Sequence, residues 1–162
     1  MRIKNMKNSQ KNIKSWLFGV CLTSVLVAGT LLNSSKTNAA DIVVYKNPSC
    51  GCCGKWVEHM QEAGYDVTVK NRSNLNAEKM LYGVPEKLQS CHTAVVDGYF
   101  IEGHVPASDV KRLLTERPAI RGLAVPGMPS GSPGMDYPGT KAVAYQVYAV
   151  DKNGRNTVFA NH

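Results

Sequence analysis

The sequence predicts an α/β domain in which helices flank a mixed four-stranded sheet and a β-hairpin follows at the C-terminus. Short β-prone runs alternate with segments of helical period, as expected for this fold class. Two turn pairs, Asp97-Gly98 and Asn153-Gly154, each lie between two β-prone runs, which is a strong local signal for a hairpin. Residues 41–162 are long enough to fold as one domain with a core of its own.

Residues 1–39 are predicted to be a secretory signal peptide. Residues 1–15 contain five Lys and Arg and no acid, residues 16–32 are uncharged and mostly apolar, and the segment ends in the small residue Ala39. A basic start, an apolar centre and a small-residue exit are typical of a cleaved leader. We expect cleavage after Ala39 or Ala40. The alternative is an uncleaved membrane anchor, although the apolar run is shorter than the roughly 20 residues of a typical span.

Most of the excess positive charge lies in this leader. The chain has 19 Lys and Arg against 12 Asp and Glu, and six of the basic residues but none of the acidic ones lie in residues 1–39. The rest of the chain therefore has 13 basic and 12 acidic side chains. This balance gives no reason to expect a nucleic-acid partner, and a membrane is expected as a partner only through an uncleaved leader.

The first predicted strand and helix lie on either side of a cysteine-rich loop. Residues 42–45 form an apolar run that predicts a buried strand. Beyond the loop, Trp56, Met60 and Ala63 repeat at spacings of four and three, which predicts a helix with one apolar face, and Gly64 is suited to end it. The cysteines therefore stand at a strand-to-helix junction.

The core continues with a strand, a helix, a β-hairpin and a last helix. These segments are, in order, 67–69, 74–82, 93–96, 99–101 and 107–116. The hairpin turns at Asp97-Gly98. The resulting order β-α-β-α-β-β-α is the thioredoxin-like order, so we expect a thioredoxin-like core over residues 41–118 with helices on both faces of the sheet.

The chain changes character after this core. Residues 122–139 are rich in Gly and Pro and contain two Met, which predicts an irregular loop. The runs 142–150 and 157–159 flank the Asn153-Gly154 turn and predict a β-hairpin over residues 142–160.

Four of the five cysteines lie in the predicted domain, and three of them fall within four positions. Cys50 and Cys53 form a C-x-x-C pair at the start of the first helix, with Cys52 between them. Unpaired N–H groups and the positive end of the helix dipole favour thiolate over thiol at such a position. In a thioredoxin-like fold, the loop that holds Cys91 lies against this segment. We therefore expect all four thiols to meet.

This cluster predicts a metal site. Thiolates select soft ions such as copper(I), zinc or the iron of iron–sulfur clusters. The adjacent pair Cys52-Cys53 suits bridging between several copper(I) ions better than a single tetrahedral zinc, whose cysteine ligands usually stand further apart in the sequence. Copper(I) bound by Cys50, Cys52, Cys53 and Cys91 is the favoured interpretation, and zinc is the alternative.

Three other uses of the cysteines remain open. A thiol–disulfide oxidoreductase needs only an attacking and a resolving thiol, for which Cys50 and Cys53 are the candidates, and it would leave the other two thiols surplus. The cluster could also serve a zinc-stabilised interaction domain without catalysis, or structural disulfides.

Two histidines and two methionines are candidates for further metal ligands. His92 follows Cys91 directly, and His104 precedes the last core helix. Met128 and Met135 lie in the Gly- and Pro-rich loop, and their thioethers are soft ligands that such a loop could bring over the thiols. For each residue the alternative is an ordinary structural role, as a hydrogen-bonded loop histidine or as a methionine that packs the loop onto the core.

The two remaining histidines are expected to take no part in the site. His59 falls away from the apolar face of the first helix, so we expect it to be solvated. His162 is the terminal residue, and we expect it to be mobile.

Several blocks of the sequence resemble the CopG-like periplasmic copper-resistance proteins, a metal-binding family that contains a domain of unknown function with a C-x-C-C motif. These blocks are residues 45–56, 90–94, 101–107, 122–129 and 131–135. The resemblance implies a thioredoxin-like fold and copper handling in the periplasm of a Gram-negative bacterium. It also implies that copper is held by the C-x-C-C cysteines together with the later cysteine, and it suggests an oxidoreductase that cycles copper between its two oxidation states.

We therefore expect a periplasmic copper-binding protein of copper resistance or homeostasis. Its ligands would be copper(I) ions, in a multinuclear cluster where several are bound. Its expected partners are metal ions together with copper-export or copper-chaperone proteins.

Overall fold

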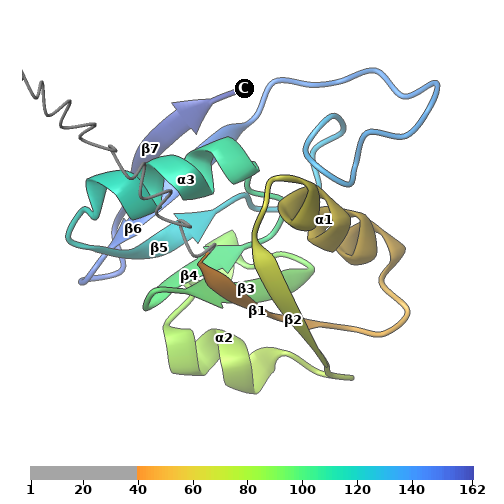
Figure 1. Cartoon of the computed structure of the whole chain (residues 1–162). Helices are drawn as coiled ribbons and strands as arrows, with labels where there is room; N and C mark the ends of the chain where they lie inside the picture. The colour runs from red at the N-terminus through yellow and green to blue at the C-terminus, as the bar shows by residue number, and fades with distance from the viewer. Residues whose placement is uncertain (1–39) are drawn as a thin grey trace, which may run out of the picture. The chain divides into compact units, whose positions relative to one another are not determined.

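A computed structural model describes residues 40–162, and the predicted signal peptide, residues 1–39, lies outside this part of the chain. The described residues form a mixed α/β structure (Figure 1). Its elements are, in chain order, β1 (Asp41–Lys46), α1 (Gly51–Glu62), β2 (Asp66–Asn71), α2 (Asn76–Tyr82), the short 3₁₀ helix η1 (Glu86–Leu88), β3 (His92–Val96), β4 (Tyr99–Glu102), α3 (Ala107–Glu116), β5 (Ile120–Ala124), β6 (Gln146–Asp151) and β7 (Asn156–Asn161). No helix within residues 40–162 has the length and apolar character needed to cross a bilayer.

All strands belong to one sheet of seven in the order β2-β1-β3-β4-β5-β6-β7. The pairs β1/β2 and β4/β5 are parallel and the other pairs are antiparallel, so the predicted mixed sheet is confirmed. The prediction of four strands is wrong. The C-terminal hairpin extends the same sheet, and β5, which the sequence did not predict, joins the hairpin to β4.

The missed strand also moves the boundary of the irregular loop. The loop was expected to begin at Gly122, but Gly122 lies in the middle of β5, opposite Phe100 of β4. A Cβ atom at Gly122 would lie 2.1 Å from the Phe100 carbonyl oxygen, so the close pairing of these two strands requires a glycine. The feature that looked like a loop signal in the sequence is therefore a packing requirement of the sheet.

Helices cover both faces of the sheet, as Figure 1 shows. The larger core lies on the α1 and α3 side, and the smaller core lies on the side of α2 and η1. Alternate residues of the central strands face opposite cores: Ile101 faces the larger core and Phe100 the smaller, and Leu123 and Ala124 divide in the same way. The central strands are therefore covered on both faces, whereas the edge strands β2 and β7 contain no fully buried residue.

Two turns with positive φ fix the ends of β3, β4 and α2. Asp97 and Gly98 both have positive φ, at 47° and 83°, as the predicted two-residue hairpin turn between β3 and β4 requires. Gly83 ends α2 in the left-handed conformation, with φ 67°, and its N–H caps the helix by bonding to Met80 O. Both local signals were correctly read from the sequence.

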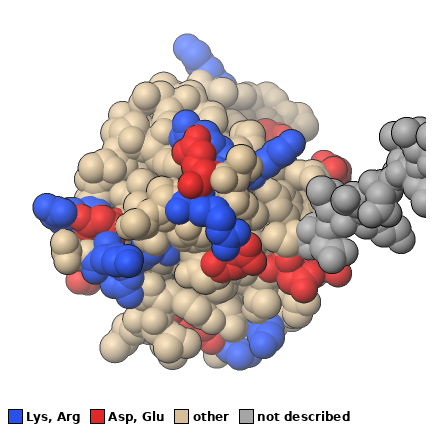
Figure 2. Space-filling view, turned by 60° about the vertical axis from the view of Figure 1, so that its left-hand side comes forward, with Lys and Arg blue, Asp and Glu red and all other residues tan. Residues whose placement is uncertain are grey.

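Acidic and basic side chains are interspersed on the face of the molecule seen in Figure 2. Elsewhere within residues 40–162, Arg117 and Asp97 form an exposed ion pair at 3.0 Å, and Arg155 and Asp151 form another at 2.7 Å. The first joins the end of α3 to the turn between β3 and β4, and the second lies within the turn between β6 and β7. Exposed pairs of this kind contribute about 0–1 kcal/mol.

The close approach at Gly122 gives a first prediction. We expect Gly122→Ala to lower the free energy of unfolding by about 1–3 kcal/mol, the usual cost of overpacking a core, because the added methyl group would collide with the Phe100 carbonyl. Urea unfolding followed by circular dichroism measures this loss.

The matched control is Gly54→Ala in α1, where an added Cβ meets nothing within 4 Å. This change should raise stability by about 0.5–1 kcal/mol, because alanine is favoured over glycine inside a helix. Equal stabilities for Gly122→Ala and the parent would contradict the close packing of β4 and β5.

Candidate metal centre

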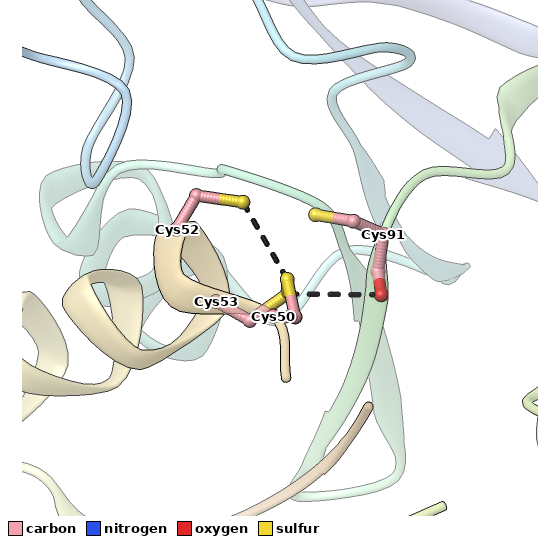
Figure 3. A group of neighbouring side chains, drawn as sticks. All are labelled: Cys50, Cys52, Cys53 and Cys91. Carbon is pink, nitrogen blue, oxygen red and sulfur yellow. Dashed lines mark hydrogen bonds between the residues drawn. A yellow bond between two sulfur atoms is a disulfide. The ribbon is translucent and has the colours of Figure 1, made fainter. Parts of the chain in front are cut away.

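Four cysteine side chains meet where β1 leads into α1 and the chain enters β3 (Figure 3). Cys50 is the N-cap of α1, Cys52 and Cys53 lie in its first turn, and Cys91 immediately precedes β3. Their four Sγ atoms all lie within 4.8 Å of one another. The expectation that all four thiols come together is therefore met by the geometry.

The C-x-x-C pair is oxidised in this structure. Cys50 and Cys53 form a disulfide with a Cα–Cα distance of 5.4 Å, whereas Cys52 and Cys91 are free thiols. The Cys52 sulfur lies 3.5 Å from that of Cys50, and the Cys53 sulfur lies 3.8 Å from the Cys91 carbonyl oxygen. Reduction would therefore convert a two-thiol site into a four-thiol site without bringing in a residue from elsewhere.

The start of α1 favours negatively charged sulfur. Its first turn contains no acidic residue, and no side chain caps its free N–H groups. The N–H of Cys50 itself bonds to Asn47 O at 3.0 Å, which holds the turn that delivers the cysteines. Unpaired N–H groups and the positive end of the helix dipole stabilise thiolate at this position.

Cys91 lies in a different electrostatic environment. Burial, followed by the neighbouring Cys52 sulfur, raises the pKa of its thiol to about 12. Cys91 is therefore protonated at neutral pH while no ion is bound. A metal that binds this sulfur must displace the proton, so binding should become tighter as pH rises.

Cys91 also belongs to a second group of possible ligands, with His92 and His104, whose ligand atoms again lie within 4.8 Å of one another. The Cys91 sulfur lies 3.0 Å from His104 Nε2 and 3.5 Å from His92 Nδ1. Because the Pro133 carbonyl oxygen can only accept, His104 Nδ1, which lies 2.8 Å away, must carry the proton. Its Nε2 lone pair then faces Cys91.

Both imidazoles are neutral. Burial lowers the pKa of His104, and burial, followed by the repulsion that the two rings would feel if both were protonated, lowers the pKa of His92 well below its usual range. The His92 ring packs against Trp56 at a tilt of 45°, with ring centroids 4.5 Å apart, and its Nε2 is buried without a hydrogen-bond partner. A neutral imidazole is the form that binds metal. This donor set of sulfur and nitrogen fits a soft or borderline ion.

The Gly- and Pro-rich segment lies against the cysteines, as expected for a cover. Gly134 packs so closely on α1 that a Cβ atom there would lie 2.7 Å from Cys52 O and 2.9 Å from Trp56 N. The Gly127 carbonyl accepts a hydrogen bond from Ser90 Oγ at 2.5 Å. The bond from His104 to Pro133 is a third contact. The segment is therefore attached to α1, to the loop that holds Cys91 and to the loop that holds His104.

The two methionines of this segment differ in exposure. Met128 is 53% exposed, whereas Met135 is half-buried and directly follows Gly134. Met135 is therefore the better placed of the two candidate thioether ligands.

The expectations for the other two histidines are wrong. His59 is half-buried, and its Nε2 accepts a hydrogen bond from the Ala107 N–H at 3.1 Å, so it links α1 to the start of α3. His162 is held in place: its Nε2 lies 2.7 Å from Asp109 Oδ2, and its ring stacks on Tyr145. Neither helical period nor position at the terminus could reveal partners so distant in the sequence.

Two residues that support the loop holding Cys91 were not predicted from the sequence. Lys79 of α2 and Glu102 of β4 form a buried ion pair that contacts Ser90, the residue before Cys91. One signal was available: Glu102 ends the otherwise apolar run of β4, at a position that alternation assigns to the interior.

Comparison with known proteins places these residues in a wider context. Residues 88–135 match a family described as "Protein of unknown function, DUF411", a stretch that contains Cys91 and both candidate histidines. Two solved structures, "Copper resistance protein copG- Form 2" and "Copper resistance protein copG- Form 1", are each 44% identical to this chain and cover 76% of it and 98% of their own length, with TM-scores of 0.73 and 0.72. No curated protein matches the chain.

The raised pKa of Cys91 gives a prediction for the oxidised protein. Because the thiol stays protonated, we expect iodoacetamide to modify Cys91 at pH 8 at least about 100-fold more slowly than an unhindered cysteine peptide. The rate should still be rising at pH 10. Peptide mass spectrometry after timed labelling separates Cys91 from Cys52. A rate that has its midpoint near about pH 8.5 and levels off by about pH 10 would show an ordinary pKa.

The contact at Gly134 gives a prediction for the cover. Gly134→Ala should displace the segment from α1 and speed alkylation of the Cys52 thiol by about 5- to 30-fold, the effect of 1–2 kcal/mol of strain on a closed–open equilibrium. Gly139→Ala is the matched control, because Gly139 has nearly the same φ, 82° against 81°, but nothing within 4 Å of its Cβ position. Equal rates for both variants would mean that the segment does not protect the site.

Proposed function

Since the chain belongs to the family of the copper resistance protein CopG, we propose that it is a periplasmic copper-resistance protein that binds copper(I) through Cys50, Cys52, Cys53 and Cys91. The observation that carries the proposal is the convergence of the four Sγ atoms within 4.8 Å. No single strand or helix could supply such a set, because the fourth sulfur comes from a loop 38 residues after Cys53.

Charge balance favours several copper(I) ions over one zinc. Four thiolates in a half-buried site carry four negative charges, which the end of one helix dipole, worth roughly half a charge, cannot offset. One zinc ion would leave two of these charges uncompensated. Each copper(I) ion cancels one charge, and bridging sulfur lets several ions share the site. We therefore propose a multinuclear copper(I) cluster, with a single structural zinc as the alternative.

We further propose that the neighbouring groups extend this site. Cys91 is shared between the sulfur cluster and the group with His92 and His104, so an ion bound to it could also take an imidazole nitrogen. The bond of His104 to Pro133 supports this role, because it fixes the tautomer that presents Nε2. Met135 is a further candidate, and Met128 a weaker one because of its exposure.

The disulfide supports a redox step at the same site. When the Cys50 and Cys53 thiolates each give one electron to a copper(II) ion, an S–S bond forms and two copper(I) ions result. A dithiol reductant then restores both thiols by exchange and becomes a disulfide itself. Cys53 is fully buried and Cys50 is half-buried, which suits Cys50 as the attacked sulfur and Cys53 as the resolving one.

This observation also favours a second candidate function, a thiol–disulfide oxidoreductase that needs no metal. It would use the same two sulfurs and leave Cys52 and Cys91 without a task. The order β-α-β-α-β-β-α over the first four strands and three helices supports a thioredoxin-like core for either function.

The surroundings of the protein are proposed from the sequence. The basic and apolar character of residues 1–39 supports export to the periplasm of a Gram-negative bacterium. Copper-export or copper-chaperone proteins are the partners that a copper(I) carrier in this compartment would require.

Metal loading of the reduced protein tests the proposal. We expect more than one copper(I) ion per chain to be retained against a competing chelator without oxygen, with the four thiols protected from alkylation. Cys91→Ser should weaken copper binding by at least about tenfold, the low end of what removal of even an outer partner costs a metal site. Ser49→Ala is the control in the mature chain and should retain the metal, because Ser49 is an exposed neighbour of Cys50 that bonds to Asn47 through its backbone N–H.

The other outcomes identify the alternatives. One tightly held zinc with weak copper binding would favour the zinc-stabilised domain. An absence of retained metal, together with a Cys50–Cys53 disulfide that dithiols readily reduce, would overturn the metal proposal and leave the oxidoreductase.

A further inference from the structure

A buried ion pair lies directly beneath the loop that holds Cys91. Lys79 comes from α2 and Glu102 from the end of β4, and their exposed fractions are 5% and 0%. The Lys79 ammonium group donates to Glu102 Oε1 and to Thr93 Oγ1, the latter at 3.1 Å, and Thr93 Oγ1 in turn donates to Glu102 Oε2 at 2.7 Å. The three side chains form one closed polar network on the α2 side of the sheet.

This network holds both backbone groups of Ser90. The Ser90 N–H donates to Glu102 Oε1 at 2.6 Å, and the Ser90 carbonyl accepts from Lys79 Nζ at 3.0 Å. The Ser90 side chain bonds to Gly127 O on the covering segment. Ser90 lies outside β3, so no neighbouring strand bonds to its N–H or its carbonyl group. The ion pair supplies a partner for each of these two groups.

Cys91 is therefore fixed from both sides. Ser90 before it is held by Lys79 and Glu102, and the carbonyl of His92 after it accepts a hydrogen bond from the Gly103 N–H at 3.0 Å. With both neighbours held, the Cys91 side chain has little freedom except rotation about its own bonds. Its sulfur lies among the other three, as Figure 3 shows.

Stability alone does not account for a charged pair at this place. Removing two charges from water costs about as much as their attraction returns, so an apolar pair of similar volume is often as stable or more stable. An apolar pair, however, could not bind the N–H and C=O groups of Ser90, which would lose these partners in a partly buried position. What the charged pair adds is a fixed position for the backbone before Cys91.

We infer that Lys79 and Glu102 are positioning residues that hold Cys91 in place as a metal ligand. The inference rests on the proposed function, since it concerns how the fourth thiol of that site is delivered. Neither residue touches the sulfur cluster in the contacts described for residues 40–162, so they act through Ser90.

The test is a charge-free double variant, Lys79→Met with Glu102→Gln, which removes both charges together and leaves neither buried alone. We expect its copper(I) affinity to fall by about 10- to 100-fold, the usual effect of losing partners that orient a metal ligand. In the Cys91→Ser background the same double change should have no further effect, because the ligand that it positions is already absent.

The matched control uses the other ion pair of α2. Arg72→Met with Glu78→Gln removes a pair whose Arg72 Nε and Glu78 Oε1 lie 2.7 Å apart, which is more exposed and has no bond to Ser90. This control should bind copper(I) as the parent protein does. Thermal unfolding and near-ultraviolet circular dichroism of each variant separate a local effect from loss of the fold.

The outcomes are distinct. Parent-like copper affinity in the folded Lys79/Glu102 variant, or an equal loss with and without Cys91, would overturn the positioning role. If the parent protein itself binds no copper(I), the proposed function would be overturned instead. If the double variant does not fold, Thr93→Val carries the test: it should lower copper affinity by about 2- to 10-fold, the worth of one or two hydrogen bonds, in the parent but not in the Cys91→Ser background.

Discussion

The antiparallel pairing of β1 with β3 is the constraint on which the site depends. Lys46, the last residue of β1, pairs with His92, the first residue of β3. Because the strands run in opposite directions, the end of β1, where the chain leaves toward α1, lies beside the start of β3, where the chain arrives from Cys91. The turn at Asn47 then needs only four residues to bring Cys50 to this place. A slip of one residue would turn His92 away from Trp56 and exchange the two faces of β3.

The disulfide and the proposed metal site use the same sulfur atoms, so they exclude each other. While Cys50 and Cys53 are joined, Cys52 and Cys91 are the only free thiols of the cluster, and Cys91 holds its proton because it is buried. Reduction and loss of protons must therefore both precede a site with four thiolates. The Gly- and Pro-rich segment contacts α1 through Gly134 and the Cys91 loop through Gly127. If it protects the thiols, as we predict, the proposed metal binding and the oxidation of the thiols both depend on access past this segment.

Local features of the site could be predicted from the sequence, and so could the approach of Cys91 through the expected fold, but the other long-range contacts could not. The cysteine cluster, the Asp97-Gly98 turn and the helix after the cysteines are all signals carried by neighbouring residues. The strand β5 was missed because Gly122 suggested a loop, whereas it is required by the approach of Phe100 from another strand. No local pattern records such a contact.

The orientation of α2 also could not be predicted from the local sequence pattern. Its apolar residues Met80 and Leu81 are 80% and 73% exposed, whereas the charged Lys79 is buried. Periodicity would have placed the apolar residues inside. The orientation of α2 follows instead from Glu102, which lies 23 residues later and can be buried as a charge only with a cation beside it.

Buried polar side chains gather at the Cys91 end of β3 and β4, and they divide between the two faces of the sheet. His92 and His104 lie on the α1 side, next to the sulfur atoms, while Thr93 and Glu102 lie on the α2 side with Lys79. Burying so many polar groups costs stability unless each finds a partner, and His92 Nε2 has none. The two sets also differ in kind. The α1 side carries groups that can bind an ion, and the α2 side carries groups that bind the backbone. Cys91 lies between the two sets. The α1 side offers it neighbours that could share a bound ion, and the α2 side holds the backbone of the loop that carries it.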